Sequence, residues 1–319
     1  MKSIFQRFTL GVTLACATGF SVCAAPLQRT DVMADPAWLL HLDADALRPT
    51  AIGKYILAQL DKPEARDKLA DLQAIFSIDI RTQLHGFTRY GTTPSPEDGV
   101  LIAYADFDAE RLVTLAKGVG EYQSTHHNKH VIHSWVVKKK VEGGEDSSRV
   151  FASIVGNRVV FSRRETDVAK VLDVMDGASP SLASGAAFPE LGAPGDSYFL
   201  EAAATKINFP NSNPSAAILK LSKSVQLTFG ETHEQLHGAL TLIADNEDVA
   251  QHILSIAQGL IALMKIQTDK SDIVAIANAL AVKQNGSSVI VTLALPADKV
   301  VTIIKADAAR KAAARDANQ

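Results

Sequence analysis

One stretch of the chain has residue types and a spacing that could perform metal chemistry: His233-Glu234-Gln235-Leu236-His237, an H-E-x-x-H pattern. On a helix, two histidines four residues apart share a face and can bind one zinc ion, while the glutamate activates the metal-bound water. The pattern therefore makes His233 and His237 candidate zinc ligands. Glu234 is the candidate catalytic residue of a zinc-dependent hydrolase.

The residues around this motif favour a β-hairpin over a helix. Apolar residues alternate with polar ones through 225–229 and again through 236–244, and residues 230–235 lie between as the loop. The five motif residues resemble the zincin metallopeptidases, but Leu240 and Ile243 replace the glycine and the third histidine ligand of the extended pattern. A zinc hydrolase thus remains an alternative to an ordinary hairpin.

A second group of histidines lies at 126–133, where four of the nine histidines fall within eight residues. If Asn128-Lys129 forms a two-residue turn, His127 and His130 face each other across a hairpin. A facing imidazole pair can hold zinc, copper or nickel, although a firm site needs three or four ligands. We favour a polar hairpin tip and keep His127 and His130 as candidate metal ligands.

The first 24 residues are typical of a cleavable secretory signal. Lys2 and Arg7 give a basic start, an uncharged, largely apolar run follows from 8 to 22, and small residues follow it, with cleavage expected after Ala24. Both cysteines, Cys16 and Cys23, would leave with this peptide, so the mature chain would contain none. We therefore expect a periplasmic or secreted protein without disulfides.

Composition excludes some function classes. Removing residues 1–24 takes away two basic residues and no acidic one, which changes the net charge from −3 to −5. Nucleic-acid binding normally needs a strong basic patch, so we expect no nucleic-acid partner. The most apolar later segment, 249–264, contains four polar residues at intervals and predicts an amphipathic helix, so we expect no transmembrane segment in the mature chain.

Strand and helix patterns alternate along the rest of the chain. We expect a first α+β unit at 25–177, a Ser-, Ala-, Gly- and Pro-rich linker at 178–195, a second unit at 196–308 and a solvated tail at 309–319. The predicted fold class is α+β, with antiparallel sheets and helices packed on one face.

Two local similarities between the halves predict a tandem duplication of a β-α-β-β-α-β-β unit. A strand followed by an acidic residue and a helix occurs at 99–108 and again at 238–247. A hairpin that leads into a helix turns at Gly156-Asn157 in the first half and at Asn285-Gly286 in the second.

Four short segments resemble exported bacterial proteins to which no function is assigned. They are 52–55 (Ile-Gly-Lys-Tyr), 87–91, 122–125 and 132–135, spread over most of the mature chain. The resemblance implies export and transfers no activity and no catalytic residue.

The sequence therefore favours a non-catalytic exported protein, with a binding or structural role in the bacterial envelope and no cofactor. Its partner would be an envelope protein or a small apolar ligand. Two alternatives remain open. One is the zinc hydrolase of His233, Glu234 and His237, and the other is a carrier of an apolar ligand held between the two units beside the 249–264 helix.

Overall fold

The fold is described from a computed structural model. It describes residues 25–63, 65–66, 69–70, 73, 78–95, 99–141, 144–192, 197–205, 218–267 and 271–316, and for 139–146 and 312–316 the backbone alone. The predicted signal peptide, residues 1–24, lies outside the described residues.

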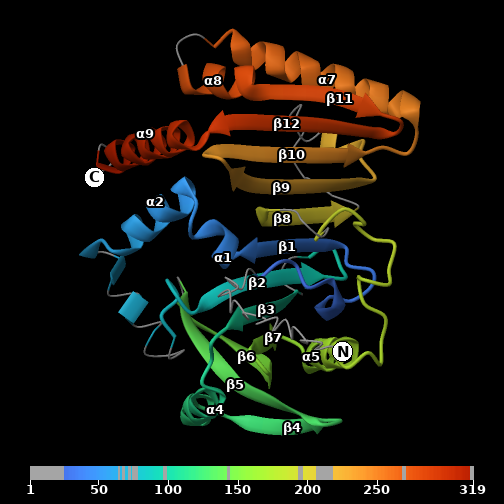
Figure 1. Cartoon of the computed structure of the whole chain (residues 1–319). Helices are drawn as coiled ribbons and strands as arrows, with labels where there is room; N and C mark the ends of the chain where they lie inside the picture. Colours follow the sequence, from blue (N-terminus) through green and yellow to red (C-terminus); the bar gives the residue numbers. More distant parts are fainter. Residues whose placement is uncertain are drawn as a thin grey trace, which may run out of the picture.

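One twelve-stranded antiparallel sheet runs through the whole molecule (Figure 1). Its strand order is β11-β12-β10-β9-β8-β1-β2-β3-β7-β6-β5-β4. The strands are β1 (Trp38–Asp43), β2 (Leu84–Gly91), β3 (Val100–Ala105), β4 (Gln123–His127), β5 (His130–Val141), β6 (Gly144–Val155), β7 (Arg158–Ser162), β8 (Tyr198–Thr205), β9 (Ser224–Thr232), β10 (Gln235–Ile243), β11 (Leu280–Asn285) and β12 (Ser288–Pro296). The predicted α+β class with an antiparallel sheet is confirmed.

Short and long helices connect these strands. They are the 3-10 turn η1 (Arg29–Asp31), α1 (Ala44–Leu47), α2 (Ala51–Leu60), α4 (Ala109–Gly118), α5 (Glu165–Met175), α7 (Glu247–Lys265), α8 (Ser271–Ala279) and α9 (Ala297–Asp316). Within the described part of the chain, none of these helices combines the length and the apolar character that a membrane crossing requires.

The strand register divides the side chains between two faces of the sheet. The α5 face carries Leu39, Tyr90, Ile102 and Val160, which form the largest buried cluster together with α5 and Leu182. The opposite face, here called the α4 face, carries the residues of opposite parity, because successive side chains of a strand point to opposite sides.

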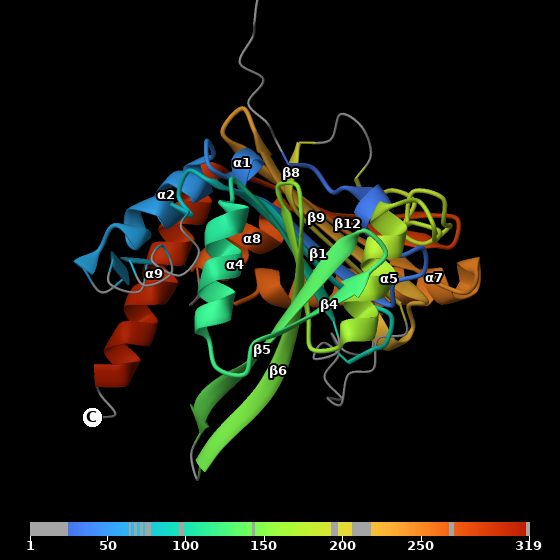
Figure 2. The same cartoon turned by 90° about the horizontal axis from the view of Figure 1, so that it is seen from below.

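The helices of the C-terminal half lie on the α4 face. Ala250, Ile253 and Ala257 of α7 pack on Leu242 and Val289 of the outer strands. On the same face, α9 packs near α2 and Leu236. The helices were expected to cover one face of the sheet only. Helix α5 differs from this expectation, because it lies on the other side of β5 and β6 from α4 (Figure 2).

The two predicted units share the sheet, joined where β1 pairs with β8. Outward from this pair the order is β1-β2-β3-β7-β6-β5-β4 on one side and β8-β9-β10-β12-β11 on the other. The duplication itself stays a prediction. The described part of the predicted linker packs over the α5 face, where Leu182, Phe188 and Leu191 are buried.

Candidate functional site: an apolar groove beneath α4

The H-E-x-x-H residues lie on the β9–β10 hairpin and not on a helix. His233 and Glu234 are the two turn residues, with φ of 51° and 60°, as a two-residue turn with left-handed backbone requires. Leu236 and His237 then continue as β10, so His237 points to the opposite face from buried Leu236. The shared helical face on which zincin ligands depend is therefore missing.

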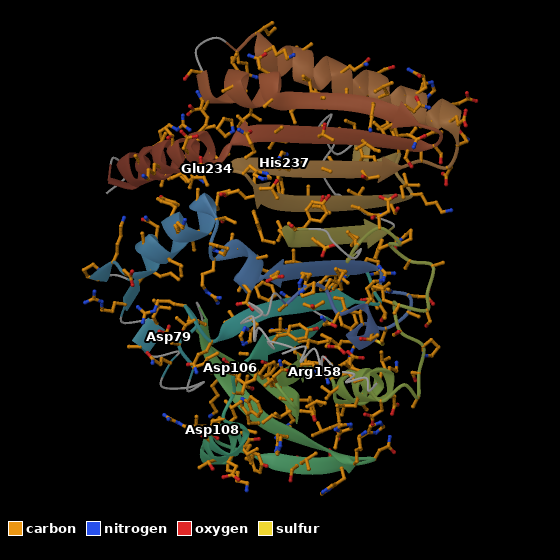
Figure 3. The ribbon with its side chains drawn as sticks, viewed as in Figure 1. Asp79, Asp106, Asp108, Arg158, Glu234 and His237 are labelled. Carbon is orange, nitrogen blue, oxygen red and sulfur yellow. The ribbon has the colours of Figure 1, made fainter. Side chains whose placement is uncertain are left out.

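The hairpin instead anchors two helices. The Glu234 carbonyl accepts a hydrogen bond from the Ala297 N–H at the start of α9, at 2.9 Å. A Glu231 carboxylate oxygen accepts one from the Ala51 N–H at the start of α2, at 2.8 Å. Figure 3 shows Glu234 and His237 at this end of β10, beside α9. These contacts give the turn a structural role.

The second histidine pair faces as predicted, with His127 directly opposite His130 in the β4–β5 register. Each ring, however, reaches an acid of α5 or of its C-cap: His127 Nε2 lies 2.8 Å from Asp173 Oδ1, and His130 Nε2 lies 3.0 Å from Asp176 Oδ2. Among the described residues, no group of three or more His, Cys, Asp and Glu side chains is arranged to hold a metal ion. Whether any metal binds His127, His130, His233 or His237 stays a prediction.

An apolar cavity of about 430 Å³ lies on the α4 face, between α4 and strands β5, β6 and β7. Its floor consists of alternate residues of the three strands, because side chains of one parity share a face. The lining is almost entirely aliphatic and aromatic: Leu112, Val113, Leu115, Ala116, Val119, His133, Trp135, Val137, Val150, Ala152, Ile154, Val159 and Phe161. Such a lining favours ligands that lose apolar surface to solvent on binding.

A second apolar cavity, of about 190 Å³, adjoins the first toward the N-terminal end of α4. The two share Leu112, Val159 and Phe161, and the second adds Phe107 and Leu101 among others. Together they form one apolar groove that follows α4. The described solvent-exposed hollows elsewhere are lined by more polar residues, such as Asp31 with Arg158 and Glu231 with Lys54.

Helix α4 covers this groove without sealing it. Asp108 caps the helix by accepting a hydrogen bond from the Arg111 N–H at 3.0 Å, so the start is well defined. None of the ten helical residues is buried, and Leu115 is 37% exposed. Val119 and Val137, at 42% and 41%, lie exposed at the same margin. The groove is thus open to solvent along one side.

Among the described residues that line the groove, His133 is the one ionisable side chain. Its Nδ1 lies 2.8 Å from the Tyr122 hydroxyl, and the two rings stack with centroids 6.0 Å apart. Burial lowers the pKa of His133, and the charge of Lys117, on the last turn of α4, lowers it further. The ring therefore favours its neutral form at neutral pH, and Lys117 is the nearby cation.

Comparison with known proteins leaves the site without a named counterpart. No family model matches the chain, and no curated protein matches it. Two solved structures resemble it distantly, crystal forms III and I of TP0453. Form III is 12% identical with a TM-score of 0.47, and the match covers 87% of this chain and 97% of the other. Form I is 12% identical with a TM-score of 0.42, and the match covers 88% of this chain and 98% of the other. Likeness at this level transfers no function.

The groove was not predicted, although its walls were. The sequence predicts a helix from Asp108 with Leu112, Val113 and Leu115, and strands over most of β5, β6 and β7. The missed signal is that β6 and β7 carry apolar side chains on both faces, as with Val159 and Val160. A strand that is apolar on both faces needs a cover on both sides, and α5 alone could supply only one.

The carrier hypothesis placed the ligand between the two units beside the 249–264 helix, and this location stays a prediction that the packing of the helix does not favour. Helix α7 packs on strands β11 and β12 and on α8, and it shares a buried cluster with Leu242 of β10 and Val225 of β9. The apolar side of this helix already packs into a hydrophobic core, where Ala250 and Ile253 are fully buried.

Proposed function

We propose that this chain is an exported, non-catalytic binding protein that holds an apolar ligand in the groove beneath α4. The observation that carries the proposal is the 430 Å³ cavity, whose lining residues are apolar except for His133. Each methylene group of a ligand buried there would contribute about 0.8 kcal/mol to binding. A bound chain would also cover the Leu115 and Val119 side chains that α4 leaves exposed.

Export is the second part of the proposal and rests on the basic, apolar and small-residue order of residues 1–24. Expression of the whole chain in a Gram-negative bacterium, followed by intact-mass measurement of the periplasmic fraction, tests it. We expect a mass that corresponds to residues 25–319. Uncleaved protein retained inside the cell would refute the export.

Binding is tested with the purified mature protein and a neutral apolar dye, Nile red, followed by fluorescence. We expect saturable one-to-one binding. Ala116→Phe places a ring in the cavity from α4; if it removes room for two methylene groups, affinity falls by about tenfold or more. Thr114→Phe is the matched control, because Thr114 is exposed on the same helix and does not line the groove.

The two variants separate the groove from other apolar surfaces. If the dye binds wild type and both variants equally, it occupies another surface, and the groove is not the binding site. If wild type does not bind the dye at all, the proposed function fails.

A further inference from the structure

The groove beneath α4 differs in charge between its two ends. Asp106 and Asp108 lie at the end where α4 begins (Figure 3). Asp79 lies in the turn before β2, whose Gln83 carbonyl accepts a hydrogen bond from the Asp106 N–H. Arg81 pairs with Asp79, and His85 contacts Asp106, so cations partly balance these acids. Asp108 instead caps the helix.

The other end of the groove carries positive charge and hydrogen-bonding groups. Lys117 is exposed on the last turn of α4, where the helix dipole favours a cation. Its charge reaches the His133 ring, which lines the groove. Tyr122 contacts His133 through the ring's Nδ1, and the other ring nitrogen, Nε2, makes no hydrogen bond to the described residues.

One acid near this end, Glu121, already has a cationic partner. Glu121 lies 3.2 Å from Arg149, which also donates to the Ser134 hydroxyl. Within the described residues, Lys117 has no such carboxylate partner. A negatively charged group placed here would meet Lys117 directly and would find His133 within reach.

We infer that the ligand is a single-chain amphiphile with an anionic headgroup, its chain lying along α4 and its headgroup beside Lys117, His133 and Tyr122. This inference rests on the proposed function and specifies the ligand class. The ten residues of α4 span about 15 Å at 1.5 Å per residue. A chain of about 12 carbons has a similar length, given carbon–carbon bonds of about 1.5 Å. The headgroup can be a carboxylate or a phosphate, which share the charge that Lys117 recognises.

The test is displacement of Nile red from the mature protein by three probes below their micelle concentrations: dodecanoate, dodecanol and a single-chain phosphatidylglycerol. Dodecanoate and dodecanol have the same hydrocarbon chain, so the difference between the concentrations at which they displace the dye reports the contribution of the headgroup. We expect dodecanoate to displace the dye at roughly threefold to fivefold lower concentration than dodecanol, the size of one partly exposed ion pair. Displacement by the phosphatidylglycerol alone would assign the headgroup as a phosphate and support the same charge recognition.

Lys117→Gln tests the residue that carries the inference. It should remove the preference for the acid over the alcohol, and the dye affinity of the variant is measured separately so that displacement is compared at equal dye occupancy. The matched control is Lys170→Gln, an exposed lysine of α5 on the other side of the sheet, which should keep the preference.

Failure of this inference can be distinguished from failure of the proposed function. If the dye binds but acid, alcohol and phospholipid displace it equally, the headgroup inference is wrong and the groove remains an apolar site. If Lys117→Gln weakens acid and alcohol alike, Lys117 supports the groove and does not recognise a headgroup. Absence of dye binding by wild type would remove both.

Discussion

Helices α4 and α5 pack on opposite sides of the same strands, β5, β6 and β7, yet they bury their apolar residues to very different extents. Val168, Val171 and Leu172 of α5 are fully buried, whereas no residue of α4 is buried. Polar contacts follow the same division, since the β4–β5 hairpin reaches α5 through Thr125–Glu165 and His127–Asp173. One helix completes a core, and the other covers a groove.

The difference shows that apolar sequence on a helix does not by itself specify a sealed contact. Both helices are amphipathic, and both lie on strands with apolar side chains. On the α5 side, the loop at 178–192 adds Leu182, Phe188 and Leu191 to the helix and closes the edges of the cluster. On the α4 side, the groove keeps exposed apolar margins at Leu115 and Val137. A ligand that covers these margins would make the two sides more alike.

The largest expected contrast is between leucines on the two helices. Leu172→Ala should lower the free energy of unfolding by about 3 to 5 kcal/mol, because it leaves a cavity in a closed core. Leu112→Ala on α4 should cost about 1 kcal/mol or less, since its side chain is only half-buried. Urea unfolding of both variants measures the contrast. Equal losses would mean that α4 is packed as tightly as α5.

The next contrast is between histidines on the two faces. His41 is fully buried on the α5 face, where its ring nitrogens contact the Thr88 hydroxyl and the Ala25 carbonyl at 2.9 and 3.0 Å. Burial lowers its pKa from 6.5 to about 4. Below pH 6.5 the unfolded chain takes up a proton that the folded chain refuses, so stability falls as the pH drops toward 4. The contribution reaches about 3 kcal/mol.

This contribution is measured as the difference between wild type and His41→Gln in urea unfolding at pH 7 and at pH 4.5. We expect the variant to lose less stability between the two pH values than wild type does. His133→Gln on the α4 face is the control and should retain most of the wild-type slope, because His133 is only half-buried. Identical slopes for His41→Gln and wild type would show that His41 is not held neutral.

The smallest expected effect concerns the polar contact between α5 and the β4–β5 hairpin, which has no counterpart on α4 among the described residues. Asp173→Asn removes the carboxylate from His127 and Asn128, and we expect a loss of about 0.5 to 1 kcal/mol, as for a partly exposed pair. Glu110→Gln, an exposed change on α4, should alter stability by less. Thermal unfolding at low salt compares them. A larger effect for Glu110→Gln would reverse the proposed ranking of the two helices.

Much of the local structure followed from patterns within short stretches. Alternating apolar residues on both sides of His233-Glu234 predicted the hairpin, and the turn dihedrals confirm it. Gly156-Asn157 and Asn285-Gly286 were predicted as turns. The first is confirmed, whereas the second turn lies one residue later, at Gly286-Ser287, because Asn285 still pairs with Ser288. These predictions succeed because a turn and its flanking strands depend on neighbouring residues, whose φ and side-chain alternation are local properties.

The candidate site could not be predicted in the same way. Its walls come from α4 and from alternate residues of β5, β6 and β7, so it exists only once the 39 residues between the end of α4 and the start of β7 have folded back. The pairing of β1 with β8, which joins the two halves, could not be predicted either. No short pattern encodes which strand of one half pairs with which strand of the other.

The sequence by itself determined the α+β class, the hairpins and the helices that begin after Asp108 and at Glu247, because turn residues and apolar periodicity act over a few positions. The tertiary structure decided what those elements do together. It placed His233, Glu234 and His237 on a hairpin, paired His127 and His130 with acids at the C-terminal end of α5, and set α4 over the groove. These outcomes depend on which surfaces meet, and burial of one surface by another is a property of the whole folded chain.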